Sequence, residues 1–404
     1  MNVLYLSYDG MTDPLGQSQV LPYLFGLSKA GYKIHLISFE KPERNHLVSG
    51  LKKEITEQGI TWHPLVYHKK PAVLSTLFDI LILKQKVIKL HTEFNFQLVH
   101  CRSYITAIAG LHLKQKRGVS FIFDMRGFYA DERVDGGLWP QDKFVYKFIY
   151  QYFKQLEKKL LINADAIVSL TNSAKNIMQN WQLKKLPLPI TVIPCCADLA
   201  HFNFMNSQKT ITKTQLKIAD DALVITYLGA IGTWYMLDEM LLFFKSLLQV
   251  KPDALFLFIT TESANTIFNA AQKLDISQTQ IRVVSANRQQ VPSYLLLADL
   301  AIFFIKPTFS KKASSPTKQA ELMGMGLPII CNAGVGDTDY IVNETNSGIA
   351  LPDLTVETFK KTADNLNELL CLDKHHIYEG AIRFFDLNKG IEQYQQVYQR
   401  LLKQ

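Results

Sequence analysis

The residues best suited to bind an anionic ligand lie between Lys306 and Asp339. Four lysines stand in a loop rich in serine and threonine, after an apolar run that ends at Ile305: Lys306, Lys311, Lys312 and Lys318. Glu321 follows three residues after the last lysine, in a segment with a helical pattern. Lysines at the carboxyl end of a parallel strand favour phosphate binding, and a carboxylate can accept two hydroxyl hydrogen bonds. The segment predicts a site for a ligand with phosphate and sugar hydroxyls, with Lys318 as the first candidate for the phosphates.

Simpler structural interpretations exist for the same residues. We place Glu321 in the first turn of its helix, where a carboxylate is favourable for electrostatic reasons alone. Lysines in a loop are commonly a solvated surface. The position at the carboxyl edge of a parallel sheet favours the anion site over these alternatives.

Two glycine turns follow strand-like runs, one in each half of the chain. Gly10 and Gly16 come after the first run, with Gly16 and Gln17 at the start of a helix, and Gly229 and Gly232 repeat the pattern. A helix N-terminus favours anions, but neither turn has the G-x-G-x-x-G spacing of a dinucleotide site. Two turns facing each other would suit a ligand with a central diphosphate, and ordinary turn geometry is the alternative.

Short apolar runs alternate with helical patterns, which predicts an α/β protein with parallel sheets. The expected strands are 2–8, 32–39, 60–67, 96–101, 119–124, 166–171 and 190–194, then 223–229, 254–260, 281–286, 300–305 and 327–332. The alternating pattern begins again after residue 194, which predicts two doubly wound units with a boundary between Val192 and Phe204. Expected helices include 16–31, ended by Gly31, and 236–250. The tail 386–404 is amphipathic, with one apolar face formed by Ile391, Tyr394, Val397, Tyr398 and Leu401.

Length and composition fit two globular domains, because 404 residues with 48% hydrophobic and 20% charged residues exceed one ordinary core. Five scattered cysteines show neither disulfide nor zinc spacing, which favours a reduced, cytoplasmic protein. The start has no signal-peptide pattern, and we expect no membrane span.

The net positive charge is confined to the first half of the chain. Residues 1–200 hold 25 Lys and Arg against 16 Asp and Glu, whereas residues 201–404 hold 19 against 20. Phospholipid, a lipid-linked phosphate and nucleic acid all match such a basic half, and a merely soluble basic surface is the alternative. The helical segment 141–161 interleaves lysines with aromatic residues. We favour core packing for it, with contact to an anionic membrane surface as a second role.

The motif S-S-P-T-K-x-x-E-x-x-x-M-G-x-P at 314–328 resembles the donor-binding signature of group 1 (family 4) retaining glycosyltransferases. Residues 123–139, 192–202 and 227–241 resemble other parts of the same family. The resemblance implies the GT-B fold, in which two Rossmann-like domains face a cleft and a C-terminal helix crosses back to the first domain. The implied domains are 1–197 for the acceptor, 198–385 for the nucleotide sugar, and 386–404 for the returning helix.

The chain departs from the family pattern at two places. The E-x₇-E motif keeps its second glutamate as Glu321, which the resemblance assigns to the ribose, but its first glutamate is replaced by Ala313. Without this glutamate, we expect Ser314, Ser315 or backbone groups to contact the donor sugar. Thr233 and Trp234 stand where relatives carry Arg and Lys. The predicted donor site comprises Gly16, Gln17, Gly229, Gly232, Thr233, Arg288, Lys312, Ser314, Ser315, Thr317, Lys318, Glu321, Gly334, Val335 and Gly336.

Asp124 and Arg126 directly follow an expected strand in the first domain, where relatives have a histidine near the donor sugar. With Lys318 they are the candidate catalytic residues, since Asp124 could orient a hydroxyl and Arg126 could hold a phosphate. An Asp–Arg pair that only pins the loop is an equally favoured interpretation.

The resemblance implies hexosyl transfer, with retention, from a UDP- or GDP-linked sugar to a saccharide or lipid-linked acceptor in surface-polysaccharide synthesis. No cofactor, metal or nucleic acid is expected, and Asp337–Asp339 is not expected to bind metal. We expect a cytoplasmic monomer or weak dimer, with peripheral contact to the inner face of the membrane through the first domain. The alternatives are a sugar-nucleotide epimerase of similar fold and a non-catalytic subunit that binds sugar nucleotide.

Overall fold

The computed structural model describes residues 1–71, 73–181, 183 and 187–402. The chain divides into two compact units: unit 1 is Met1–Pro194 together with Leu387–Gln404, and unit 2 is Cys195–Asp386. The first crossing between the units falls after Pro194, within the stretch 192–204.

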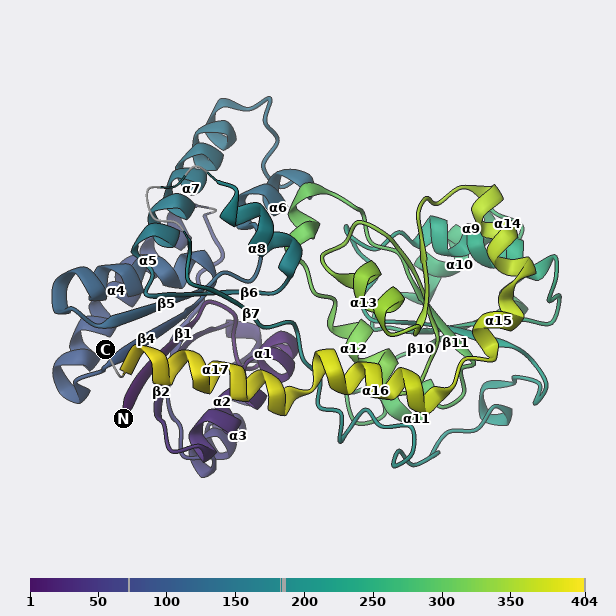
Figure 1. Ribbon diagram of the computed structural model, residues 1–404, viewed down its shortest axis with the longest axis horizontal. Helices are drawn as coiled ribbons and strands as arrows, with labels where there is room; N and C mark the ends of the chain where they lie inside the picture. Colours follow the sequence, from purple (N-terminus) through teal and green to yellow (C-terminus); the bar gives the residue numbers. More distant parts are fainter. Residues whose placement is uncertain (72, 182, 184–186, 403–404) are drawn as a thin grey trace. The chain divides into compact units, whose positions relative to one another are not determined.

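Unit 1 is built on a seven-stranded parallel sheet in the order β3-β2-β1-β4-β5-β6-β7 (Figure 1). The strands are β1 Asn2–Ser7, β2 Lys33–Glu40, β3 Thr61–Val66, β4 Leu98–Arg102, β5 Ser120–Asp124, β6 Ala166–Ser169 and β7 Ile190–Val192. Strands β2 and β3 are added on one side of β1, and the strands from β4 onward are added on its other side. The switch point of the sheet therefore lies between β1 and β4. The central strands are buried along their whole length, as expected for a sheet covered on both faces.

Helices cover both faces of this sheet. Helix α5 packs between α4 and α7 on one side, while α2 packs against α17 on the other (Figure 1). The helices of unit 1 are α1 Pro14–Gln19, α2 Leu21–Lys29, η1 Pro42–Arg44, α3 Asn45–Glu57, α4 Leu74–Phe94, α5 Ser103–Arg117, α6 Tyr129–Asp135, α7 Phe144–Asn163, α8 Asn172–Gln179 and α17 Leu387–Leu402.

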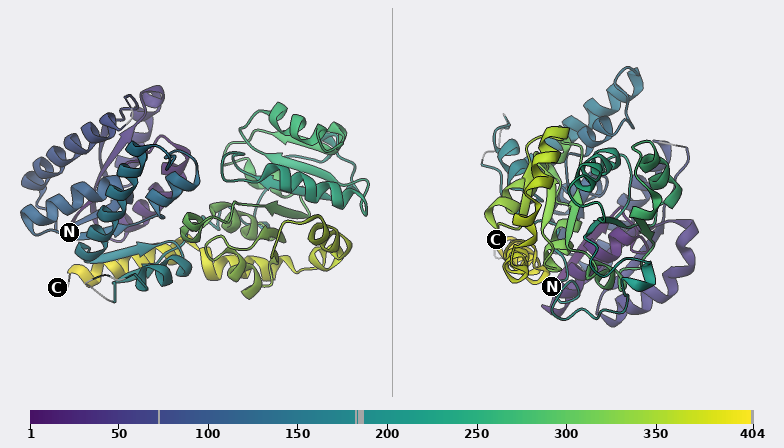
Figure 2. Two further views of the ribbon diagram at one scale, coloured as in Figure 1. Left: turned by 90° about the horizontal axis from the view of Figure 1, so that it is seen from above. Right: turned by 90° about the vertical axis from the view of Figure 1, so that its right-hand side faces the viewer.

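The C-terminal helix α17 belongs to unit 1 although its sequence follows unit 2 (Figure 2). Its buried residues are Gly390, Ile391, Tyr394, Val397, Tyr398 and Leu401, which include the whole apolar face predicted from sequence. Close packing explains why α2 has a glycine here, because a Cβ at Gly26 would lie 2.3 Å from Ile391 Cδ1.

Unit 2 has a six-stranded parallel sheet in the order β10-β9-β8-β11-β12-β13. The strands are β8 Val224–Leu228, β9 Leu255–Ile259, β10 Ile281–Val284, β11 Leu300–Phe303, β12 Ile329–Asn332 and β13 Gly348–Leu351. The helices are η2 Thr214–Leu216, α9 Leu237–Leu248, α10 Ala264–Gln272, η3 Gln278–Gln280, α11 Val291–Leu295, η4 Phe309–Ala313, α12 Thr317–Gly324, α13 Thr338–Glu344, α14 Val356–Asp364, α15 Leu366–Leu370 and α16 Lys374–Phe385. The predicted α/β class with two doubly wound units is confirmed.

Two local predictions were wrong. The expected helix 16–31 is two helices that break at Val20, because Pro22 cannot continue a helix through this point and instead lies in the first turn of α2. Strand β13 was not expected, because Gly348 opens a run of only four residues.

Among the described residues no helix is long and apolar enough to cross a membrane.

Candidate functional site

The candidate site of unit 2 lies at the switch point of its sheet, between β8 and β11. Here the order in which successive strands are added changes from one side of β8 to the other. Ligands of doubly wound sheets bind outside the carboxyl ends of the strands at such a point. Gly229 follows β8 with φ of +112°, and its N–H donates to the Ile259 carbonyl. This backbone conformation is unfavourable for residues other than glycine, so the predicted glycine turn has a structural requirement.

The loop after Gly232 is fixed to the end of β11 by backbone hydrogen bonds. The N–H of Met236 donates to the Phe304 carbonyl at 3.0 Å, and the N–H of Lys306 donates to the Trp234 carbonyl at 3.0 Å. Tyr235 forms an isolated β-bridge with Ile305. Trp234 and Tyr235 are thereby held beside the lysine-rich segment, whereas Gly232 and Thr233 are exposed.

The segment with the predicted motif folds as a short 3₁₀ helix, η4, followed by α12. Helix α12 begins at Thr317, directly after Pro316, because the residue before a proline is disfavoured in helical conformation. The expectation that Glu321 lies in the first turn was wrong, since Lys318 occupies that turn and Glu321 lies in the second. Both side chains are buried, at 7% and 8% exposed.

The ammonium group of Lys318 is held by two tyrosines. Its Nζ donates to Tyr227 Oη at 2.9 Å and lies 3.6 Å from the centroid of the Tyr235 ring. A Cβ at Gly229 would lie 3.2 Å from the same Nζ, which places the ammonium at the glycine turn. Burial holds the pKa of Lys318 well below the usual range of lysine. An anion at this turn would compensate for that lost hydration.

Glu321 forms an ion pair with Arg288, whose Nη1 lies 2.9 Å from Oε1. Burial raises the pKa of Glu321 above its ordinary value, and Arg288 acts in the opposite direction. The carbonyl of Arg288 lies 2.9 Å from His201 Nε2, and its guanidinium stacks over Phe202. Arg288 belongs to the predicted donor site, and the structure pairs it with the carboxylate of Glu321.

The predicted residues Gly334, Val335 and Gly336 lie in the loop after β12 and meet the lysine-rich segment. The N–H of Gly336 donates to the Lys311 carbonyl at 2.8 Å, and Lys312 Nζ lies 3.9 Å from the position of a Cβ at Gly334. The N–H of Gly334 donates to Asp339 Oδ2 at 3.3 Å. The structure brings these residues together, but the N–H groups of both glycines already have acceptors within the protein.

The serines near the missing glutamate have structural contacts of their own. Ser315 Oγ accepts a hydrogen bond from the N–H of Cys195 at 3.1 Å, and the N–H of Ser314 donates to the Lys311 carbonyl. Ala313 is buried in η4, and Thr317 is the first residue of α12.

The glycine turn of unit 1 is organised around an internal carboxylate. Glu40, at the end of β2, accepts hydrogen bonds from the N–H groups of Met11 and Thr12 at 2.8 and 3.0 Å and from Thr12 Oγ1. A Cβ at Gly16 would lie 2.2 Å from the Gly10 carbonyl oxygen, so this glycine is required by backbone packing. Gln17 is exposed. Glu40 therefore occupies the N–H groups of Met11 and Thr12 in the turn, and the N–H of Gln17 donates to the Asp13 carbonyl at 3.1 Å.

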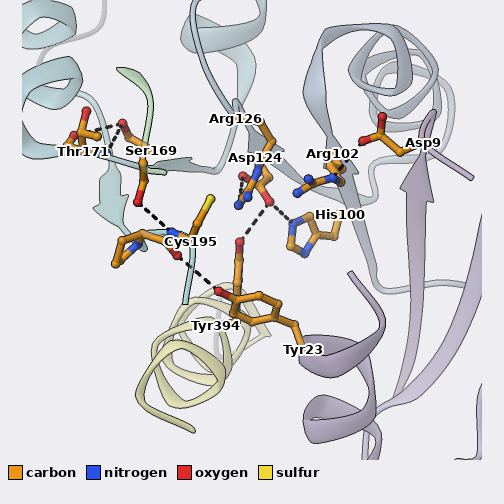
Figure 3. Close-up of polar contacts among 12 residues, drawn as sticks. Asp9, Tyr23, His100, Arg102, Asp124, Arg126, Ser169, Thr171, Cys195 and Tyr394 are labelled. Carbon is orange, nitrogen blue, oxygen red and sulfur yellow. Dashed lines mark hydrogen bonds and ion pairs between the residues drawn. The ribbon is translucent and has the colours of Figure 1, made fainter. Parts of the chain in front are cut away.

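Asp124 lies inside unit 1, fully buried, in a network that ends on the C-terminal helix (Figure 3). Tyr394 donates to Asp124 Oδ2 at 3.0 Å, His100 Nε2 lies 3.4 Å from the same oxygen, and His100 Nδ1 lies 2.8 Å from Tyr398 Oη. Arg126 Nη1 is 3.9 Å from Asp124 Oδ1. Burial opposes ionisation, but Arg126 and His100 outweigh it and hold the pKa of Asp124 below its ordinary value. Asp124 is therefore held by Tyr394 and His100, and Arg126 contributes its positive charge at longer range.

We expect Asp124→Asn and Tyr394→Phe each to lower the free energy of unfolding by about 1–3 kcal/mol at pH 7, because each removes a buried hydrogen bond to a charged group. The folded-state pKa of Asp124 is depressed, so its contribution is present above the unfolded value near 3.9 and is lost as pH falls below it. Urea unfolding at pH 7 and pH 3 tests both points. The control is Tyr32→Phe. Tyr32 is a half-buried tyrosine that faces Gln399 of α17, the helix that also carries Tyr394. Loss of turnover in Asp124→Asn at wild-type stability would instead indicate catalysis.

The side chains of these networks that were not expected from sequence include Tyr227, Tyr235 and Glu40. Tyr235 had a recognisable signal, since an aromatic pair after a glycine turn can hold lysine side chains from a facing loop. Tyr227 and Glu40 are single residues at strand ends, and only the tertiary fold shows what they contact.

Solved structures with the same fold support the class that these two units define. The chain has a TM-score of 0.75 with sucrose-phosphate synthase from Thermosynechococcus elongatus, at 15% identity and covering 100% of this chain and 99% of that one. For HepE from Anabaena in complex with UDP and glucose the TM-score is 0.69, at 11% identity and 98% and 99% coverage. UDP-GlcNAc 2-epimerase from Neisseria meningitidis is less similar, with a TM-score of 0.57 at 12% identity and full coverage of both chains. The protein has the GT-B fold.

The family follows from sequence models of both halves. Residues 23–201 match Glycosyltransferase Family 4, and residues 208–379 match Glycosyl transferases group 1. No curated protein sequence matches the chain. The protein belongs to the group 1 (family 4) glycosyltransferases, which transfer a sugar from a nucleotide sugar.

Proposed function

We propose that the protein transfers a hexosyl unit from a UDP- or GDP-linked sugar to a hydroxyl acceptor, with retention of anomeric configuration. The observation that carries this proposal is the pair formed by Lys318 and Glu321. The two buried side chains, of opposite charge, stand on adjacent turns of α12 beside the switch point between β8 and β11. The ammonium suits a diphosphate, and the carboxylate suits the two hydroxyls of a ribose.

The proposed reaction needs no protein nucleophile, metal or cofactor. The bond between the anomeric carbon and the diphosphate oxygen breaks, and the acceptor oxygen bonds to the same face of that carbon. The departing phosphate oxygen takes the proton of the acceptor hydroxyl. The contribution of the protein is to stabilise the negative charge that grows on the diphosphate, which a preorganised and buried cation does more effectively than one in water. Lys318 has that role.

The acceptor side of the proposal is a saccharide or lipid-linked precursor of a surface polysaccharide, met at the inner face of the membrane. Support comes from helix α7, whose buried residues Leu156, Glu157, Leu160 and Leu161 all lie in its second half. The prediction that the segment 141–161 packs in the core is correct for the second half of α7 and wrong for its first half. Phe144 is 83% and Phe148 64% exposed, beside the exposed lysines Lys143 and Lys147. Exposed aromatic and basic residues on one helix suit an anionic bilayer surface.

We expect the double variant Phe144→Ser/Phe148→Ser to bind vesicles of phosphatidylglycerol and phosphatidylcholine at least about tenfold more weakly than wild type, because two aromatic side chains no longer enter the bilayer interface. Vesicle co-sedimentation measures this, and added salt should weaken wild-type binding. Val356→Ser, at a 51% exposed position of unit 2, is the control. Equal binding by both variants would contradict the assignment of this helix.

A donor screen tests the proposed function. Purified protein would be incubated in EDTA with UDP-glucose, UDP-galactose, UDP-GlcNAc and GDP-mannose, with saccharide and polyprenyl-diphosphate-linked acceptors. The proposal predicts a glycosylated product whose anomeric configuration, by NMR, matches that of the donor. An inverted product would overturn retention. An epimerised donor without transfer would indicate an epimerase, and nucleotide binding without any turnover would indicate a binding subunit.

A further inference from the structure

Two adjacent aromatic residues, Trp234 and Tyr235, each receive a lysine from the segment 306–318; we call them the aromatic pair. Lys311 Nζ lies 3.7 Å from the centroid of the Trp234 ring, and Lys318 Nζ lies 3.6 Å from that of Tyr235. Both lysines are buried, at 6% and 7% exposed. Ammonium groups at these distances from an aromatic face are attracted by the ring quadrupole, more strongly when water is excluded.

The aromatic pair is held rigidly. The loop that carries it is hydrogen-bonded on both sides to the end of β11, through Met236 to Phe304 and through Lys306 to Trp234. The backbone that carries the two rings is therefore fixed relative to the switch point of the sheet. A ring that is fixed in place also fixes an ammonium group that rests on it.

The Lys318 ammonium has hydrogen-bonding capacity to spare. An ammonium has three N–H donors, and the contact to Tyr227 Oη uses one of them. No ion pair among the described residues joins Lys318 to a carboxylate, although Glu321 lies one turn away. Tyr227 in turn donates its own proton to the Ala230 carbonyl at 2.6 Å, which leaves its oxygen free to accept from lysine. Aromatic faces attract the cation without consuming its remaining donors.

We infer that Trp234 and Tyr235 are positioning residues that hold Lys311 and Lys318 to receive the diphosphate of the donor. The inference rests on the proposed function and extends it. In this chain the loop supplies aromatic rings, and the cations come from the facing segment. The anion recognised here is a nucleoside diphosphate group, and the aromatic pair contacts it only through the lysines.

The test is a set of double-mutant cycles measured by titration calorimetry in EDTA, with UDP, GDP and ADP and, for whichever binds, its monophosphate. We expect Tyr235→Leu to weaken diphosphate binding about tenfold, since a desolvated cation–ring contact is removed, and to change monophosphate binding less. In a Lys318→Met background the same substitution should have almost no effect, because it acts through the lysine. Trp234→Leu and Lys311→Met form the second cycle.

Conservative variants and a matched control separate positioning from folding. Tyr235→Phe and Trp234→Phe keep a ring and should retain wild-type affinity. Tyr294→Leu removes another half-buried tyrosine packed on the core of unit 2 and should leave affinity unchanged. Wild-type protein that binds none of the diphosphates would overturn the proposed function and this inference together. Wild-type binding with additive effects of Tyr235→Leu and Lys318→Met would overturn the positioning inference alone.

Discussion

Replacement of Glu321 by alanine is expected to weaken nucleoside diphosphate binding about a hundredfold. Two hydrogen bonds from ribose hydroxyls to a buried carboxylate contribute roughly 1.5 kcal/mol or more each, and each 1.4 kcal/mol is a factor of ten. The substitution also leaves the Arg288 guanidinium without the carboxylate it pairs with at 2.9 Å. Because the sugar–nucleotide bond is not involved, we expect KM for the donor to rise more than kcat falls. Calorimetry and steady-state kinetics measure the two effects.

A closely matched control for Glu321→Ala exists in the same unit. Glu344 also pairs with an arginine, Arg383, at 2.8 Å, but on the surface, where both side chains are more than a third exposed. Glu344→Ala should leave nucleotide affinity unchanged and alter stability little, as surface ion pairs contribute about 0–1 kcal/mol. If the two variants bind diphosphate equally well, Glu321 is only a buried helix residue and the donor-site assignment fails.

Replacement of Lys318 by methionine should strongly reduce turnover and at the same time stabilise the folded protein. The ammonium is the buried cation nearest to the glycine turn, and loss of such a group from a charge-stabilising site lowers kcat on the order of a hundredfold to a thousandfold. Without ligand, however, burial of the ammonium is unfavourable, and methionine fills similar space without charge. We expect unfolding to become harder by on the order of 1–3 kcal/mol.

The pH dependence gives this prediction a second observable. The pKa of Lys318 is lower in the folded than in the unfolded protein, so the unfolded chain binds more protons between the two values. Wild-type stability should therefore rise with pH across that interval, up to the unfolded value near 10.4, and Lys318→Met should show a flatter profile. Thermal unfolding across pH measures the slope. Lys245→Met, at an exposed lysine paired with Asp275, is the control. A less stable Lys318→Met protein would contradict this account of the buried ammonium.

The fold was largely predictable because the information is local and periodic. Buried parallel strands such as β9 and β11 are continuous apolar runs, and the apolar face of α17 repeats with helical spacing. The errors occur where this periodicity is short or interrupted. Strand β13 has four residues, and Pro22 breaks a pattern that otherwise continues through α1 and α2.

The site was predicted at the level of segments rather than contacts. The motif at 314–328 correctly brings Lys318 and Glu321 together on one helix, but Pro316 sets the start of α12 and moves Glu321 into the second turn. The partner of Glu321 is Arg288, 33 residues away in sequence. No local pattern identifies such a partner, because the fold alone decides which side chain reaches a buried carboxylate.

The same limit explains the expectations for unit 1. The glycines of the first turn suggest open N–H groups, whereas Glu40, from the neighbouring strand, already accepts hydrogen bonds from Met11 and Thr12. Asp124 suggests a catalytic carboxylate at a strand end, whereas Tyr394, 270 residues later, donates to it from the C-terminal helix. In both cases a residue distant in sequence satisfies the group that local reasoning leaves available.

The most direct test of the central claim is hydrogen–deuterium exchange of the wild-type protein with and without UDP, GDP and ADP. We predict that one of these diphosphates protects the backbone around Tyr227–Met236 and Lys306–Met325 in unit 2, beside the switch point of the sheet. Protection confined to other segments, or none with any of the three, would contradict the assignment of this site to a nucleotide sugar.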